Sequence, residues 1–162
     1  MTLGNSDLEC PFQIAYFYLM AVAQSTLVDI LKDHSIRKTG SRLDILRQFA
    51  EKGHALSQPD LEKALENQCD RVTIYRTLTL YQEKGLIHTV LDDSGAMKYA
   101  LCKDTCHDHG HHHDHVHFKC TNCGRTTCIE NALIPKIELP TGFKVQEQNL
   151  LMTGICDGCG EN

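Results

Sequence analysis

Residues 70–101 read DRVTIYRTLTLYQEKGLIHTVLDDSGAMKYAL, and the expected fold follows from this stretch. In its first half, Ile74, Leu78 and Tyr81 recur at the spacing of one face of an α-helix. Asp70 is placed to cap this helix at its N-terminus, and Gly85 is placed to end it. The pattern therefore predicts an amphipathic helix between Asp70 and Gly85.

The second half of the stretch predicts a β-hairpin. Two runs rich in strand-forming residues, 86–90 and 97–101, lie on either side of a turn at Asp93-Ser94-Gly95. A helix followed at once by a hairpin is the arrangement of a recognition helix and its wing. Residues 70–101 therefore favour a winged helix-turn-helix.

The residues before Asp70 predict two or three further helices. One covers 24–34, with Leu27, Ile30 and Leu31 on one face. The next has Ser41 as its cap and Gly53 at its end, and its inward positions are Leu43, Leu46, Phe49 and Ala50. A third begins at Ser57 and Pro59, with Leu61, Ala64 and Leu65 inward.

The residues after the hairpin predict a second, smaller unit. Strands are expected at 116–119, 126–130 and 143–151, with at most a short helix at 132–137 and a turn at 140–142. The fold class is therefore α+β: a winged helix-turn-helix followed by a small C-terminal α/β domain. The expected boundaries are 1–23 for an N-terminal extension, 24–101 for the winged helix and 102–162 for the C-terminal domain. An alternative start of translation at Met20 stays open.

Charge divides the chain in the same place. The 162 residues carry 16 Lys and Arg against 21 Asp and Glu, a net charge of −5. Residues 24–101 have 11 basic and 11 acidic side chains, whereas 102–162 have 5 and 8. The first half is the better candidate to meet phosphate, and the acidic half the better candidate to hold cations.

Cysteine and histidine are concentrated in the last third. Seven of nine cysteines and seven of ten histidines lie beyond residue 101. A secreted disulfide scaffold would need a signal peptide, but the first ten residues carry acidic and no basic side chains. The apolar run 11–23 is too short to span a membrane. We expect a cytoplasmic protein without a membrane partner.

Two C-x-x-C-G knuckles, Cys120–Gly124 and Cys156–Gly160, predict a structural zinc site. Thiolates at this spacing converge in pairs on one tetrahedral Zn²⁺, and each trailing glycine lets its turn close. A pair of disulfides or redox motifs is the alternative. The zinc ligands expected are Cys120, Cys123, Cys156 and Cys159.

A second metal site is expected where the two halves join. His88 lies in the first wing strand, Cys102 follows the second, and His115 and His117 point to one side of a predicted strand. One thiolate with three imidazoles suits Zn²⁺ better than Fe²⁺. Metal bound there would fix one half relative to the other, as a switch requires. Alternatively, the His-rich run 106–117 is a loose loop that buffers metal.

The predicted recognition helix has Thr73, Tyr75, Arg76 and Thr79 on or near its exposed side. Arg and Thr can donate to base edges and phosphates, and an exposed Tyr can contact a thymine methyl group or a phosphate. An ordinary solvated helix face is the alternative, and the wing that follows argues against it.

These motifs resemble the ferric uptake regulator (Fur) family of metal-dependent repressors. The likeness runs from about Ile36 to Gly160 and is carried by 70–88, 113–124 and 154–160. It implies a homodimer whose C-terminal domains pair through a sheet and whose winged helices bind an A·T-rich inverted repeat in double-stranded DNA. It also implies that Tyr75 and Arg76 contact DNA, and that Arg37 and Arg42 bind the minor groove and backbone.

Within the family the chain resembles the zinc uptake regulator branch. That branch has a cysteine at the position of Cys102, and iron and peroxide sensors have a histidine where this chain has Ala55. The resemblance implies His88, Cys102, His115 and His117 as the sensing ligands. The long His-rich loop leaves His113 as an alternative. Cys128 stands where an acidic ligand often lies, and is either a ligand or a buried strand cysteine.

The function expected is a zinc-dependent repressor of metal uptake genes, with one structural and one regulatory Zn²⁺. The alternatives are an iron, manganese or peroxide sensor of the same family, and a zinc-buffering protein. No H-E-x-x-H or H-x-E…P-C-x-x-C signature is present, so an enzyme is not expected.

Overall fold

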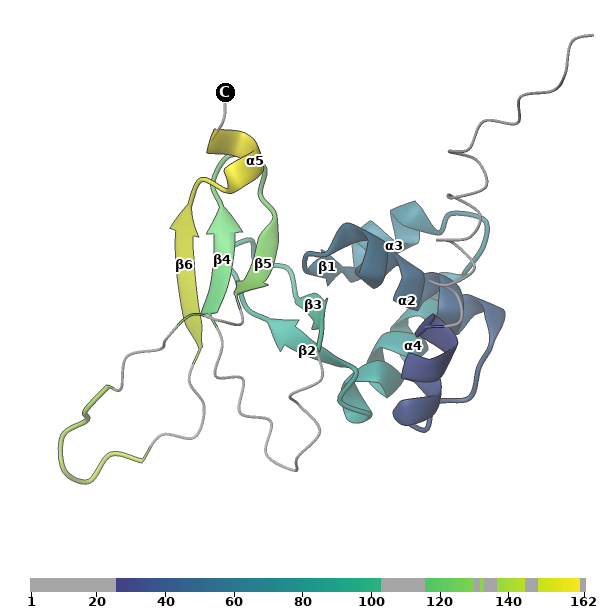
Figure 1. Ribbon diagram of the computed structural model, residues 1–162, viewed down its shortest axis with the longest axis horizontal. Coiled ribbons are helices and arrows are strands. Elements are labelled where there is room, and N and C mark those ends of the chain that lie inside the picture. Colours follow the sequence, from purple (N-terminus) through teal and green to yellow (C-terminus); the bar gives the residue numbers. More distant parts are fainter. Residues whose placement is uncertain (1–25, 103–115, 130–131, 133–136, 145–148, 161–162) are drawn as a thin grey trace, which may run out of the picture. The chain divides into compact units, whose positions relative to one another are not determined.

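The structure is a computed structural model that describes residues 26–102, 116–129, 132, 137–144 and 149–160 (Figure 1). The chain divides into two compact units, Met1–Lys38 and Thr39–Asn162. In the first unit, residues 26–33 are helical, as the spacing of Leu27 and Leu31 predicts. The expected extension 1–23 lies outside the described residues.

Three helices open the second unit: α2 (Gly40–Lys52), α3 (Gln58–Ala64) and α4 (Arg71–Glu83), which pack on one another. The cap of α2 is Thr39, whose hydroxyl accepts the Arg42 N–H, so the prediction of Ser41 is wrong. Gly53 ends α2 with φ of 63°, in the left-handed region that favours glycine. The prediction of Gly53 is confirmed.

The caps predicted for the next two helices are confirmed. Ser57 and Asp60 form a reciprocal capping box at α3, and the Asp70 carboxylate accepts the Thr73 N–H at α4. The predicted apolar face of α4, namely Ile74, Leu78 and Tyr81, is fully buried. Ala64 is exposed and not inward, because α3 ends at this residue.

The wing is formed by β2 (Ile87–Val90) and β3 (Lys98–Leu101), which pair antiparallel as predicted. A two-residue strand that the sequence pattern did not predict, β1 (Leu56–Ser57), adds to β3, so the sheet has the order β1-β3-β2. Strand β2 also contacts α4, so the wing and this helix belong to one packed unit.

The second sheet has the order β5-β4-β6, with β4 (Val116–Cys120) in the centre. Strand β5 (Thr126–Ile129) pairs antiparallel with β4, and β6 (Leu150–Gly154) pairs parallel with it. The third strand was predicted at 143–151, but Phe143 and Lys144 are not in a strand and β6 continues to Gly154. The turn predicted at 140–142 is present, and most of the short helix predicted at 132–137 lies outside the described residues.

A four-residue helix, α5 (Asp157–Gly160), follows β6. Strand β4 therefore carries its residues toward one knuckle, and the parallel β6 carries the chain toward the other (Figure 1). This parallel pairing places two segments that lie more than thirty residues apart at the same end of the sheet. No helix of the described residues is long and apolar enough to cross a membrane.

Candidate metal centres and nucleic-acid interface

The four knuckle cysteines form one cluster. Sulfur atoms of Cys120, Cys123, Cys156 and Cys159 all lie within 4.8 Å of one another, and the Sγ atoms of Cys123 and Cys156 are 3.8 Å apart. A tetrahedral zinc with Zn–S bonds of about 2.3 Å separates its sulfurs by about 3.8 Å. Cys120, Cys123, Cys156 and Cys159 are free thiols, so the disulfide alternative finds no support at the knuckles.

Backbone amides in this cluster stabilise the thiolate form of Cys120. The N–H groups of Cys123 and Cys156 donate to Cys120 Sγ, at 3.5 and 3.4 Å. These donors lower the pKa of the Cys120 thiol to about 6. The neighbouring Cys120 and Cys159 side chains raise the pKa of Cys156 to about 12, because a second thiolate beside the first is repelled. A divalent cation would remove this repulsion, and the donor set is one that zinc prefers.

Two features of the sheet lie beside the knuckles. Thr121 donates from its N–H and its hydroxyl to the Gly154 carbonyl, at 2.8 and 3.1 Å. A Cβ on Gly154 would lie 3.0 Å from the tip of the Phe118 ring, so any other residue there would require that ring to shift.

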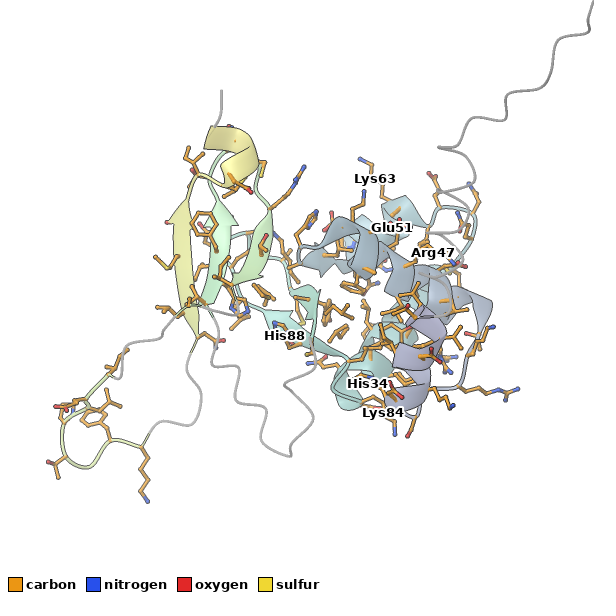
Figure 2. All side chains as sticks on the ribbon, in the orientation of Figure 1. His34, Arg47, Glu51, Lys63, Lys84 and His88 are labelled. Atoms are coloured by element: carbon orange, nitrogen blue, oxygen red, sulfur yellow. The ribbon has the colours of Figure 1, made fainter. Side chains whose placement is uncertain are left out.

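A second cluster joins the wing to the C-terminal sheet. His88 of β2, His117 of β4 and Cys128 of β5 offer ligand atoms within 4.8 Å of one another. His88 Nε2 lies 3.4 Å from His117 Nε2 and 3.4 Å from Cys128 Sγ. Both histidines are buried, and Figure 2 labels His88 on β2. Around a tetrahedral zinc, two nitrogens are about 3.4 Å apart, and a nitrogen and a sulfur about 3.6 Å.

The structure brings some of the residues predicted for the sensing site together and leaves others apart. His88 and His117 come together as expected, and Cys128 completes the cluster. Cys102 Sγ lies 3.3 Å from His88 Nδ1, at the opposite ring nitrogen from Cys128. His113 and His115 lie outside the described residues. The sequence left Cys128 open as either a ligand or a buried strand cysteine, and the structure places it opposite His117 in the β4–β5 pair.

The exposed face of α4 carries four residues in two turns. Arg71, Val72, Tyr75 and Arg76 are exposed, with 59% of Tyr75 accessible to solvent. Thr73 is half-buried, and its hydroxyl donates to the Asp70 carboxylate at 2.6 Å, so its side chain serves the helix cap. Sequence reasoning missed Arg71 and Val72, although each lies four residues before Tyr75 or Arg76 and so shares their face.

The two other predicted DNA contacts lie nearer the N-terminus. Arg42 is half-buried on α2, and its backbone carbonyl accepts the Tyr81 hydroxyl at 2.6 Å. That bond holds α4 against α2 in the second unit. Arg37 is exposed and belongs to the first unit.

The profile of the Ferric uptake regulator family matches residues 33–153. The Ferric uptake regulation proteins of Neisseria gonorrhoeae and Staphylococcus epidermidis are 33% and 30% identical to the chain. These alignments cover 80% and 83% of the chain, and 90% and 95% of the relatives. A solved structure of a zinc uptake regulator complexed with zinc and DNA is 25% identical with a TM-score of 0.59, over 87% of this chain and 95% of that one. A zinc-bound manganese uptake regulator shares the fold at 17% identity with a TM-score of 0.55, over 81% and 98%.

Proposed function

The chain belongs to the ferric uptake regulator family, and on that basis we propose that it is a zinc-dependent transcriptional repressor. The observation that carries the proposal is the cluster of His88, His117 and Cys128, whose atoms are spaced as ligands of one tetrahedral zinc. Because these ligands come from the wing and from the C-terminal sheet, metal binding there fixes the DNA-binding part relative to the rest.

The four-cysteine cluster is proposed to hold structural zinc. Its sulfurs lie at tetrahedral spacing, and it joins β4 to the end of β6. The small sheet buries few large side chains in its described part, so a metal would supply much of its stability.

The regulatory site is proposed to use His88, His117 and Cys128 as its core. His115, which the sequence predicts, is a candidate for the fourth ligand; Cys102 is a second candidate that requires the His88 ring to turn, because its sulfur lies at the other nitrogen of that ring. Imidazole with thiolate suits zinc, whereas iron and manganese sites favour carboxylates. This donor set is the reason to prefer a zinc sensor to an iron, manganese or peroxide sensor.

The DNA-binding surface is proposed to be the exposed face of α4. Tyr75 and Arg76 would reach base edges in the major groove, and Arg37 and Arg42 would contact the minor groove and backbone. Thr73 is proposed to act through the helix cap that it shares with Asp70. The target is an A·T-rich inverted repeat, whose symmetry a homodimer would match.

A homodimer is supported by the C-terminal half. Ile129, Met152 and Ile155 are exposed large apolar side chains on or beside the β5-β4-β6 sheet, as expected of a surface that another copy covers.

A repressor of this kind acts in the cytoplasm and is not an enzyme. A buffering protein would have no use for the exposed Tyr75 and Arg76 of α4, so we prefer a regulator.

The test is a DNA-binding titration in buffered metal. An operator is first selected from random duplexes with the wild-type protein in zinc, and its affinity is then measured against free Zn²⁺, Fe²⁺ and Mn²⁺. We expect zinc alone to tighten binding at concentrations that leave the structural zinc saturated. A response to Fe²⁺ or Mn²⁺ would move the protein to another branch. No selected duplex with any metal would support the buffering function instead.

A further inference from the structure

Asp92, at the start of the wing turn, has a carboxylate that is fully buried and bonded from two directions. Within the wing it accepts Lys98 Nζ at 2.7 Å and the Ser94 N–H at 2.9 Å. From the C-terminal sheet it accepts the Thr126 hydroxyl at 2.7 Å. A buried carboxylate without donors would be strongly unfavourable, so these partners hold the turn in one place.

Thr126 binds the winged half a second time. It is the first residue of β5 and is fully buried, and its carbonyl accepts the Ala55 N–H at 2.7 Å. Its side chain therefore contacts the wing turn while its backbone contacts the segment just before β1. A third contact lies beside these, where Lys119 of β4 pairs with Asp93.

These contacts lie next to the proposed metal ligands on the same two strands. In the β4–β5 pairing, His117 is opposite Cys128, and Lys119 is opposite Thr126. Two residues of strand span about 7 Å, so the contacts and the ligands are neighbouring rungs of one ladder. Cys128 also packs against Ala55, Val90 and Ala100 of the winged half. In this arrangement of the rungs, His88 lies beside His117 and Cys128.

We propose that Asp92 is a positioning residue for the regulatory metal: its bond to Thr126 docks the wing on β5 before metal binds. This inference rests on the function proposed above. A site whose competent arrangement is only partly populated binds metal more weakly by that fraction. Asp92 and Thr126 therefore set how much free metal the switch requires, although neither touches the metal.

The test compares Thr126→Val with Thr127→Val in full-length protein that retains its structural zinc. Valine keeps the shape of Thr126 and removes only the donor to Asp92. Thr127 lies on the other side of the same strand and is the matched control. Co²⁺ is titrated into the second site against a competing chelator, while its thiolate charge-transfer absorption is followed. We expect Thr126→Val to weaken the second Co²⁺ by on the order of tenfold, and Thr127→Val to leave it unchanged.

Asp92→Asn is the second variant. It also alters the bonds to Lys98 and Ser94, so it should weaken the site at least as much as Thr126→Val. Adding Thr126→Val to Asp92→Asn should cost less than Thr126→Val costs alone, because both changes act on the Asp92–Thr126 bond. Hydrogen exchange gives a metal-independent readout: the Ala55 amide should be protected in wild-type protein that carries structural zinc alone. Protection should fall in Thr126→Val, while amides within α2 keep theirs.

Three results would overturn the positioning role. They are wild-type Co²⁺ affinity in both Thr126→Val and Asp92→Asn, additive losses in the double variant, and an unprotected Ala55 amide in the wild type. Failure of the proposed function looks different, because wild-type protein would then bind no second Co²⁺ at all.

Discussion

Cys128→Ser is the substitution that most directly tests the regulatory site. Cys128 Sγ lies 3.4 Å from His88 Nε2, which fits a shared zinc, and a neutral hydroxyl is a poor ligand for that metal. Loss of a second-shell partner typically costs 10–100-fold in metal affinity, so loss of a ligand should cost about 100-fold or more.

This loss of zinc affinity lowers the stabilisation that bound zinc gives to the folded protein. Zinc held at 100 times the wild-type Kd stabilises the folded protein by about 2.7 kcal/mol. If the Kd rises about 100-fold, the same zinc concentration equals the new Kd and stabilises the protein by only about 0.4 kcal/mol. The variant should therefore lose about 2.3 kcal/mol of the zinc-dependent stabilisation and keep the stability that the four-cysteine site provides.

The assay is denaturant unfolding in buffered zinc, run beside operator binding in the same buffers. Cys69→Ser is the matched control, because Cys69 is a half-buried free thiol that belongs to neither cluster. Cys102→Ser is measured as well, since Cys102 is a candidate fourth ligand. If Cys128→Ser keeps wild-type zinc dependence while Cys102→Ser loses it, Cys128 is a strand cysteine and the proposed ligand set is wrong.

Four further predictions concern the rest of the molecule. Cys156→Ser should release the structural zinc and unfold or dissociate the C-terminal half; full zinc content in a folded dimer would contradict the assignment. Arg76→Ala should weaken selected operators by about 1–3 kcal/mol and relax discrimination at one position, whereas Arg42→Ala should weaken all sequences alike and reduce the salt slope by about one phosphate. Equal specific and non-specific losses for Arg76 would make it a backbone contact. Tyr81→Phe should cost about 1 kcal/mol of unfolding free energy through its 2.6 Å bond to the Arg42 carbonyl, and an unchanged denaturation midpoint would refute this. Gly154→Ala should cost about 1–3 kcal/mol, because its Cβ would lie 3.0 Å from the Phe118 ring; wild-type stability would show that Phe118 moves aside freely.

Local sequence patterns were enough for much of the winged half. Ser57 and Asp70 are caps because their side chains reach amides three residues ahead, and the face of Ile74, Leu78 and Tyr81 follows from helical spacing alone. Ser41 failed because Thr39, two residues earlier, offers the same chemistry. Strand β1 is two residues long and is defined by its pairing with β3, so it is too short for a sequence pattern to predict it.

The proposed metal ligands also differ in how far the sequence alone predicts them. The knuckles are visible because each pair is close in sequence, whereas the cluster at His88 draws on three strands. Periodicity puts His117 on one face of its strand but cannot say which residue of the next strand lies opposite. The β4–β5 register supplies that answer, and it is Cys128. Cys102 was predicted from its position after the wing, and the structure puts its sulfur at the other nitrogen of the same ring.

The central strand β4 explains why this chain would need two metal sites with different tasks. It carries His117 and ends at Cys120, so the strand that presents a regulatory ligand is held at its end by the structural cluster. Zinc bound at the four cysteines would fix β4 relative to β6. Zinc at His88, His117 and Cys128 would then add the wing to a sheet whose geometry is already set. Loss of the structural metal would therefore remove regulation as well. Loss of the proposed regulatory metal would leave the sheet intact, so a response to free zinc would not require the protein to unfold.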